Sequence, residues 1–223
     1  MNSLDLNVAY SLCEICHEEA DLYPLLSKRY FEKKYSPHWF LCKKCYKEFE
    51  KLITYIENAI LFLHKDFYFE VNINEIIKDK NGESKKITPI AKDYFYIKFN
   101  PSYIIKNGKH RNGRRKGNNG DLRNDTCAIC RTTENLSLHH WFKRAVFGEY
   151  NNNSVMTLCL DCHQDVENKI DQMEKQILGQ LEEIYYFIQN LLYLKKINFD
   201  DDKIFIIHVT RGEDQKYSFI LEN

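Results

Sequence analysis

Apolar residues recur at helical spacing in two long segments of the chain, about 44–65 and about 160–195. In the first segment the apolar positions are Phe49, Leu52, Ile53, Ile56, Ile60 and Leu63. In the second segment they are Val166, Ile170, Met173, Ile177, Leu181, Ile184, Ile188 and Leu191. Each pattern predicts an amphipathic helix with its apolar face against a core. Gly179 lies within the second segment, and we expect it to bend or interrupt that helix.

Segments rich in aromatic and β-branched residues follow each predicted helix. They predict strands at 67–71 and 94–99 after the first helix, and at 203–209 and 217–223 after the second. The stretches LSLHHWF and SVMTLC predict a further antiparallel pair of short strands that leads into the second helix. The expected fold class is therefore α+β.

All eight cysteines lie in Cys-x-x-Cys pairs, which we call knuckles. The pairs are Cys13/Cys16, Cys42/Cys45, Cys127/Cys130 and Cys159/Cys162, spaced C-x2-C-x25-C-x2-C and C-x2-C-x28-C-x2-C. Two knuckles supply four thiolates for one tetrahedral ion, so we predict two structural zinc sites. The alternatives are a disulfide framework and free structural or redox cysteines. A disulfide framework needs an oxidising compartment, and the start MNSLDLNVAY shows no secretory signal.

The two halves of the chain share one order of motifs, which indicates an internal duplication. SLCEIC aligns with DTCAIC, and WFLCKKCYKEFEKLI aligns with MTLCLDCHQDVENKI. Leu22 and Leu136 each lie six residues after the second cysteine of a knuckle. We expect an N-terminal zinc module with a β-rich extension at 1–105, a linker at 106–123, and a second zinc module with a long helix and C-terminal strands at 124–223.

The predicted linker is rich in Gly, Asn and basic residues, and has no apolar residue before Leu122. Its basic side chains include Lys106, Lys109, Arg111, Arg114, Arg115 and Lys116. We expect them to contact phosphates of a nucleic acid and to order on binding, a solvated tether without a partner being the alternative. Because 32 basic residues balance 32 acidic ones, a polyanion would have to be held by such a local patch.

Composition narrows the class of protein. Hydrophobic residues make up 43% and charged residues 29% of the chain, which is typical of a soluble globular protein and argues against wholesale disorder. No stretch approaches the roughly 18 apolar residues that cross a bilayer, so we expect a cytoplasmic protein that does not contact membranes.

Three of the eight histidines gather at one end of the second module. His139 and His140 lie between its knuckles, and His163 directly follows its last cysteine. The corresponding residues of the first module are Leu25, Leu26 and Tyr46. The zinc scaffold therefore does not require histidine at these positions. We predict that these imidazoles share a divalent ion separate from the zinc, a chance surface cluster being the alternative.

The order of these motifs resembles the HNH, or ββα-metal, endonucleases with a structural zinc. The resemblance covers about 125–170, from the knuckle at Cys127 through the dyad His139-His140 to the Cys162-His163 ending. It implies a treble-clef-like ββα fold that hydrolyses nucleic-acid phosphodiester bonds with a divalent cation such as Mg²⁺ or Mn²⁺. The products would be a 5′-phosphate and a 3′-hydroxyl.

The resemblance also assigns roles to residues. His139 and His163 would hold the catalytic ion, and Glu167 lies where some members place a further ligand. His140 would be the general base that takes a proton from the attacking water. The family's usual asparagine position is Ser154 here, so Asn153 is the substitute assignment. Lys143 and Arg144 follow the dyad and are expected either to grip flanking phosphates or to be solvated loop charges.

Two zinc modules with an additional β-rich part resemble the compact restriction enzymes of this family, in which a degenerate copy helps to grip DNA. We therefore expect site-specific cleavage of double-stranded DNA by a homodimer. The apolar stripe Met173, Ile177, Leu181, Ile184 and Ile188 is either its interface or part of the core of one chain. A homing or phage nicking nuclease is one alternative function. A non-catalytic zinc module that binds nucleic acid or protein is the other.

Overall fold

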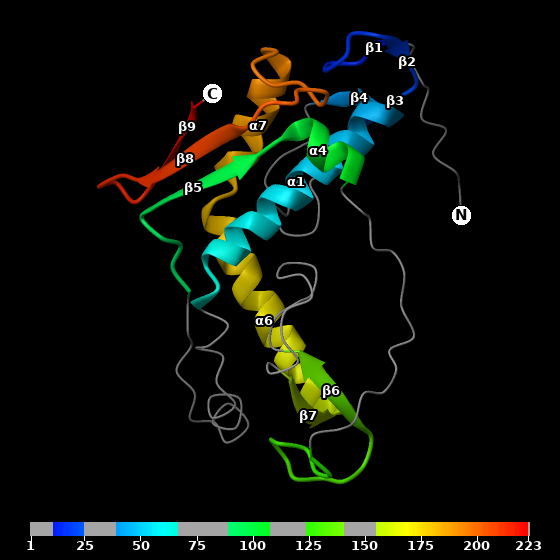
Figure 1. The fold of residues 1–223 in the computed structure, drawn as a ribbon, viewed down its shortest axis with the longest axis vertical. Helices are drawn as coiled ribbons and strands as arrows, with labels where there is room; N and C mark the ends of the chain where they lie inside the picture. Colours follow the sequence, from blue (N-terminus) through cyan, green and yellow to red (C-terminus); the bar gives the residue numbers. More distant parts are fainter. Residues whose placement is uncertain (1–10, 25–38, 67–88, 108–123, 141–154, 223) are drawn as a thin grey trace. The chain divides into compact units, whose positions relative to one another are not determined.

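The computed structural model describes residues 11–24, 39–66, 89–107, 124–140 and 155–222. They form a mixture of helices and short antiparallel strands, so the predicted α+β class is confirmed (Figure 1). The chain divides into two compact units. We call residues 1–57, 93–110 and 181–223 the sheet unit, and residues 58–92 and 111–180 the hairpin unit.

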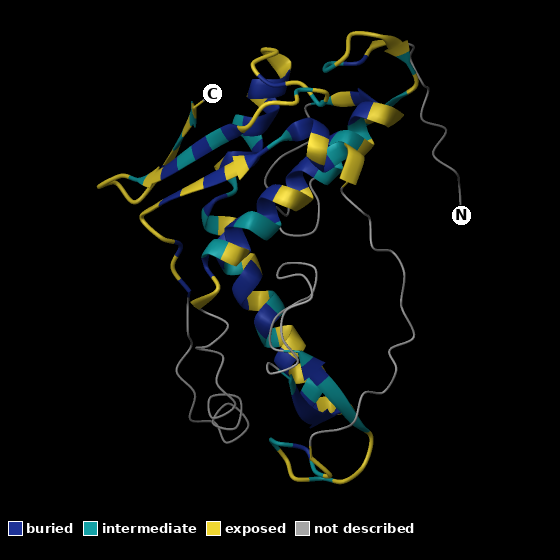
Figure 2. Cartoon of the chain, in the orientation of Figure 1, coloured by how far each residue is buried: buried dark blue, intermediate teal, exposed yellow. Residues whose placement is uncertain are grey.

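The sheet unit contains a three-stranded antiparallel sheet of order β5-β8-β9. Its strands are β5 (Tyr94–Phe99), β8 (Phe205–Arg211) and β9 (Tyr217–Glu222). Tyr96 lies opposite His208, and His208 lies opposite Ile220. Buried and exposed residues alternate along β5, because successive side chains of a strand point to opposite faces (Figure 2). One face of the sheet is therefore part of the core.

Helices cover that buried face. The first part of α1 (Lys43–Leu63) contributes Phe49 and Leu52 to the core, and α7 (Glu183–Tyr193) contributes Tyr185. The rings of Phe49 and Tyr185 meet edge to face, with centroids 5.3 Å apart. A short helix, α4 (Pro101–Asn107), follows β5, and its Ile105 carbonyl accepts a hydrogen bond from the Lys51 ammonium.

The sheet unit also contains the first pair of knuckles. Two short hairpins hold them, β1 (Ser11–Leu12) with β2 (Glu19–Ala20), and β3 (Leu22–Pro24) with β4 (Phe40–Cys42). Helix α1 begins at Lys43, immediately after Cys42. The predicted helix at 44–65 is thus confirmed to within two residues.

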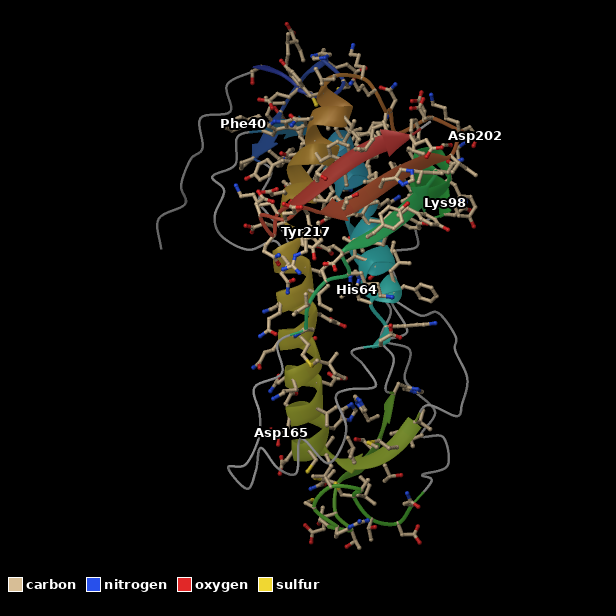
Figure 3. All side chains as sticks on the ribbon, turned by 90° about the vertical axis from the view of Figure 1, so that its left-hand side faces the viewer. Phe40, His64, Lys98, Asp165, Asp202 and Tyr217 are labelled. Atoms are coloured by element: carbon tan, nitrogen blue, oxygen red, sulfur yellow. The ribbon has the colours of Figure 1, made fainter. Side chains whose placement is uncertain are left out.

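In the hairpin unit, β6 (Leu136–His140) pairs with β7 (Val155–Cys159), and α6 (Leu160–Gln180) starts directly after β7 (Figure 1). This is the strand pair and helix that the sequence predicts. Buried His64, labelled in Figure 3, directly follows the last residue of α1. The His64 ring lies 2.7 Å from the Ile60 carbonyl through Nδ1, and accepts the Lys92 backbone N–H at 2.8 Å through Nε2.

The compact units do not follow the linear division expected from the sequence. Strand β5, placed by the sequence in the first module, pairs with β8 along its whole length, from Tyr94 opposite Thr210 to Phe99 opposite Phe205. The β-rich parts of the two predicted modules, at 1–105 and 124–223, therefore pair in one sheet. A six-residue strand exposes unpaired backbone groups at both edges, and pairing with β8 satisfies one of those edges.

Three smaller expectations are also resolved. The predicted helix at 160–195 is interrupted between Gln180 and Glu183, just after Gly179, so the expected interruption is confirmed. The predicted linker begins inside α4, because Lys106 lies in the last turn of that helix. The predicted strand at 67–71 lies outside the described residues.

The apolar stripe of the second predicted helix is buried within one chain. Its members Met173, Ile177, Leu181, Ile184 and Ile188 are at most 2% exposed. The stripe therefore belongs to intramolecular packing and gives no support to a dimer interface. Among the described residues, no helix is long and apolar enough to span a membrane.

Candidate metal centres

Each set of four cysteines forms a compact cluster that could bind zinc. In the first cysteine cluster (Cys13, Cys16, Cys42, Cys45) and in the second (Cys127, Cys130, Cys159, Cys162), the sulfur atoms all lie within 4.8 Å of one another. All eight cysteines are free thiols, which argues against the disulfide alternative.

Individual sulfur separations also fit a tetrahedral ion. The Cys16 and Cys42 sulfurs are 3.9 Å apart, and the Cys130 and Cys159 sulfurs are 3.6 Å apart. Four sulfurs at about 2.3 Å from one zinc lie about 3.8 Å from each other. The two clusters therefore have the donors and the spacing of structural zinc sites.

The two clusters have the same backbone scaffold. The His17 and Arg131 amides each donate to the carbonyl of the first cysteine of their knuckle, and both residues have positive φ, 60° and 65°. Leu22 lies opposite Cys42 in β3–β4, as Leu136 lies opposite Cys159 in β6–β7. The corresponding strand pairing and turn geometry agree with the duplication expected from sequence.

Backbone amides prepare the first cysteine of each cluster for metal binding. Burial alone raises the pKa of Cys127, but N–H groups of Cys159, Cys130 and Ile129 outweigh it and lower the pKa to about 6. In the first cluster burial likewise raises the pKa of Cys13, but hydrogen bonds from the backbone N–H groups of Cys16 and Cys42 outweigh the effect of burial. The pKa of Cys13 is therefore lowered. Thiolates are the form that binds zinc.

A third group of donors lies at the end of the β6–β7 pair. We call His139, His163 and Glu167 the histidine cluster, because one ligand atom from each lies within 4.8 Å of the others. His139 comes from β6, whereas His163 and Glu167 lie one turn apart at the start of α6. The rings of His139 and His163 meet edge to face with centroids 4.9 Å apart, and His163 Nε2 lies 3.4 Å from Glu167 Oε1.

The histidine cluster extends from the interior to the solvent. His139 is 2% exposed, whereas the side chains of His163 and Glu167 are 24% and 53% exposed. Burial, and then the nearby His163 and His140, lower the pKa of His139 to about 4. At neutral pH the His139 ring is therefore uncharged and has a nitrogen lone pair to donate. An ion could reach the cluster from the Glu167 side.

Sequence reasoning missed one residue of this site. The Ser137 hydroxyl lies 2.8 Å from His163 Nδ1 and 3.2 Å from the Leu158 carbonyl oxygen. Ser137 is two positions before His139 on β6, so the two side chains leave the same face of the strand. That alternation was the available signal, because it places a hydroxyl on the strand face that also bears His139.

The remaining predicted site residues divide into two groups. His140 is half-buried at the end of β6, opposite Val155, and is not one of the three converging donors. Strand alternation places its side chain on the other face from that of His139. The other predicted residues lie outside the described part of the chain: Lys109, Arg111, Arg114, Arg115, Lys116, Lys143, Arg144 and Asn153.

Comparisons with family models, with curated proteins and with solved structures found no match to this chain.

Proposed function

We propose that this protein is a divalent-metal-dependent endonuclease of the HNH type that hydrolyses phosphodiester bonds of double-stranded DNA. The supporting observation is the convergence of His139, His163 and Glu167 beside the second cysteine cluster. These residues come from β6 and from α6, and β6 pairs with β7, which ends at Cys159, whereas α6 contains Cys162.

The donor set suits a catalytic divalent ion. Two imidazoles and one carboxylate leave coordination positions open for water and substrate, unlike the closed four-thiolate clusters. Imidazole donors suit Zn²⁺ and similar transition-metal ions, whereas a carboxylate and bound water suit Mn²⁺ and Mg²⁺. A divalent ion held there would neutralise the phosphate and stabilise the leaving oxygen.

The protein's own residues then have distinct tasks. His139, His163 and Glu167 would hold the ion. His140 would take a proton from the water that attacks phosphorus. The basic residues Lys143 and Arg144, together with those of the linker, would bind the flanking phosphates. Cleavage would leave a 5′-phosphate and a 3′-hydroxyl.

The test is cleavage of supercoiled plasmid by purified protein with Mg²⁺ or Mn²⁺. Parallel reactions contain a chelator, the His140→Ala protein or the His163→Ala protein. His208→Ala is the matched control, since His208 lies on the three-stranded sheet and outside the histidine cluster. We expect cleavage by the wild type and by His208→Ala, and at least about a 100-fold loss with either of the other variants.

The products separate the remaining alternatives. Discrete fragments support a restriction-type enzyme, a single nick supports a nicking nuclease, and a smear indicates a nuclease without sequence specificity. Retained DNA binding without cleavage of plasmid, single-stranded DNA or RNA would replace the proposal with a non-catalytic zinc module.

A further inference from the structure

The Ser137 hydroxyl contacts two groups, and its single proton decides how each contact works. The Leu158 carbonyl oxygen can only accept a hydrogen bond, so Ser137 must donate to it across 3.2 Å. Having donated its proton, the hydroxyl can only accept from the His163 ring at 2.8 Å. With the hydroxyl proton on the Leu158 carbonyl, the His163 contact is a hydrogen bond only if His163 Nδ1 bears a hydrogen.

This assignment determines what the other ring nitrogen can do. In neutral His163 the Nε2 atom has a lone pair, and it faces Glu167 Oε1 at 3.4 Å. This contact is attractive when a cation lies between the two atoms, either a metal ion or the proton of an imidazolium ring. Ligand atoms about 2.1 Å from a common ion lie about 3–4 Å apart, so the separation suits a metal ion.

The first module provides a natural comparison. Tyr23 and Tyr46 occupy the positions of Ser137 and His163, as the strand pairing and the knuckles align them. Tyr23 is 42% exposed. The copy that lacks the imidazole therefore also lacks the short hydroxyl side chain that would orient it.

We infer that Ser137 is a positioning residue that holds His163 in the Nδ1–H tautomer, so that Nε2 is the atom presented to a divalent ion. This inference rests on the proposed function, because it assigns a role within the proposed metal site. It adds a residue that neither the knuckle spacing nor the histidine dyad identifies.

The first measurement is the tautomer itself in protein that retains its two zinc ions. Nitrogen-15 NMR distinguishes a protonated from an unprotonated ring nitrogen, and a His163→Gln spectrum assigns the signals. At a pH where His163 is neutral and the third site is metal-free, we expect hydrogen on Nδ1 in the wild type. In Ser137→Ala we expect a mixture of tautomers, and in Ser137→Thr a return to the wild-type form.

The second measurement is the affinity for Mn²⁺ by calorimetry. We expect Ser137→Ala to bind Mn²⁺ about 10- to 100-fold more weakly, as loss of an orienting partner does in other metal sites. Ser137→Thr should restore most of this affinity. Ser218→Ala is the matched control, because Ser218 also donates to the carbonyl of the residue opposite it, Thr210, but on β9. Its Mn²⁺ affinity should equal that of the wild type.

Each outcome decides the inference. Hydrogen on Nε2 in the wild type, or Mn²⁺ affinity in Ser137→Ala within twofold of the wild type, would overturn it. If the wild type binds no Mn²⁺, the positioning role is also overturned, whatever the tautomer. If Mn²⁺ binding depends on Ser137 but no nucleic acid is cleaved, the inference stands and the proposed nuclease function fails.

Discussion

The two cysteine clusters show how one scaffold is used in two ways. In both, a knuckle, a short strand pair and a helix that begins after the third cysteine bring four sulfurs together. In the second copy the first turn of the helix has His163, which contacts Ser137 and Glu167. In the first copy the same position is Tyr46. Burial, then Tyr186 and then Tyr46 raise the pKa of Tyr185.

This difference separates residues that build the fold from residues that are available for chemistry. Tyr46 and Tyr185 lie near each other in the packing of the sheet unit, where an aromatic side chain contributes buried area. His163 and Glu167 lie at a surface that an ion can reach. Changes at the cysteines should therefore affect both copies alike, whereas changes at the histidine cluster should affect only the second.

The largest effect is expected from loss of a cluster cysteine. Cys13→Ser and Cys127→Ser should each lower the tightly bound zinc from two ions per chain to one. Each should also destabilise its unit by several kcal/mol, because structural zinc binding is coupled to folding. Metal analysis and thermal unfolding measure the two effects. Two retained zinc ions in either variant would show that the corresponding cluster is not a zinc site.

Converting the second copy toward the first should have the next largest effect. His163→Tyr should keep both zinc ions and the fold, and should weaken Mn²⁺ binding at the third site by at least about 100-fold. Calorimetry with zinc-loaded protein measures the affinity. Loss of zinc or unfolding in this variant would instead show that His163 is part of the structural scaffold.

A smaller effect should come from the carboxylate. Glu167→Gln should weaken Mn²⁺ binding about tenfold, because it removes the only negative charge among the three donors. Glu50→Gln is the matched control, since Glu50 lies five residues after Cys45, as Glu167 lies five residues after Cys162. Equal Mn²⁺ affinities of the two variants would remove Glu167 from the site.

The smallest effect concerns the far ends of the two helices. His64, near the end of α1, aligns with Leu181, just after α6. Burial, and then the nearby Lys92, lower the pKa of His64, although its hydrogen bond to the Ile60 carbonyl raises that pKa. The folded state therefore binds a proton less readily than the unfolded state, whose histidine pKa is about 6.5. This contribution to stability is complete above that pH and is lost as pH falls toward the folded pKa.

The matched variant is His64→Gln, which keeps a donor and an acceptor but does not titrate. Between pH 7 and pH 5, unfolding by denaturant should show a decline in stability of at most about 1.4 kcal/mol per pH unit from this group. The decline should be smaller in His64→Gln. The same pH dependence in both proteins would assign it to other groups.

The helices, the short strands and the cysteine clusters could be predicted from the sequence, because each depends on residues close together in the chain. Cysteine spacing predicts the two clusters, since a two-residue gap lets both thiolates of a knuckle reach one ion. Helical periodicity predicts α1 and α6, and Gly179 predicts the interruption after α6. The strands β6 and β7 follow from short runs of strand-forming residues that flank the dyad.

The same patterns did not predict which elements far apart in the sequence pack against one another. The sequence placed β5 and β8 in separate modules, but the structure pairs them, because strand pairing depends on which edges meet in three dimensions. A similar limit applies to the apolar stripe at Met173 and Ile177, which the sequence left open between an interface and a core. Periodicity identifies a face that must be buried, but it does not identify what buries it.

The sequence by itself determined the donors, namely eight cysteines in four knuckles and three histidines confined to the second copy. Only the tertiary structure decided that His139, His163 and Glu167 converge while His140 lies on the other strand face. The Ser137 contact with His163 likewise joins residues 26 positions apart. The physical reason is that donor chemistry belongs to each residue type, whereas direction and distance arise from strand register and from the packing of helix on hairpin.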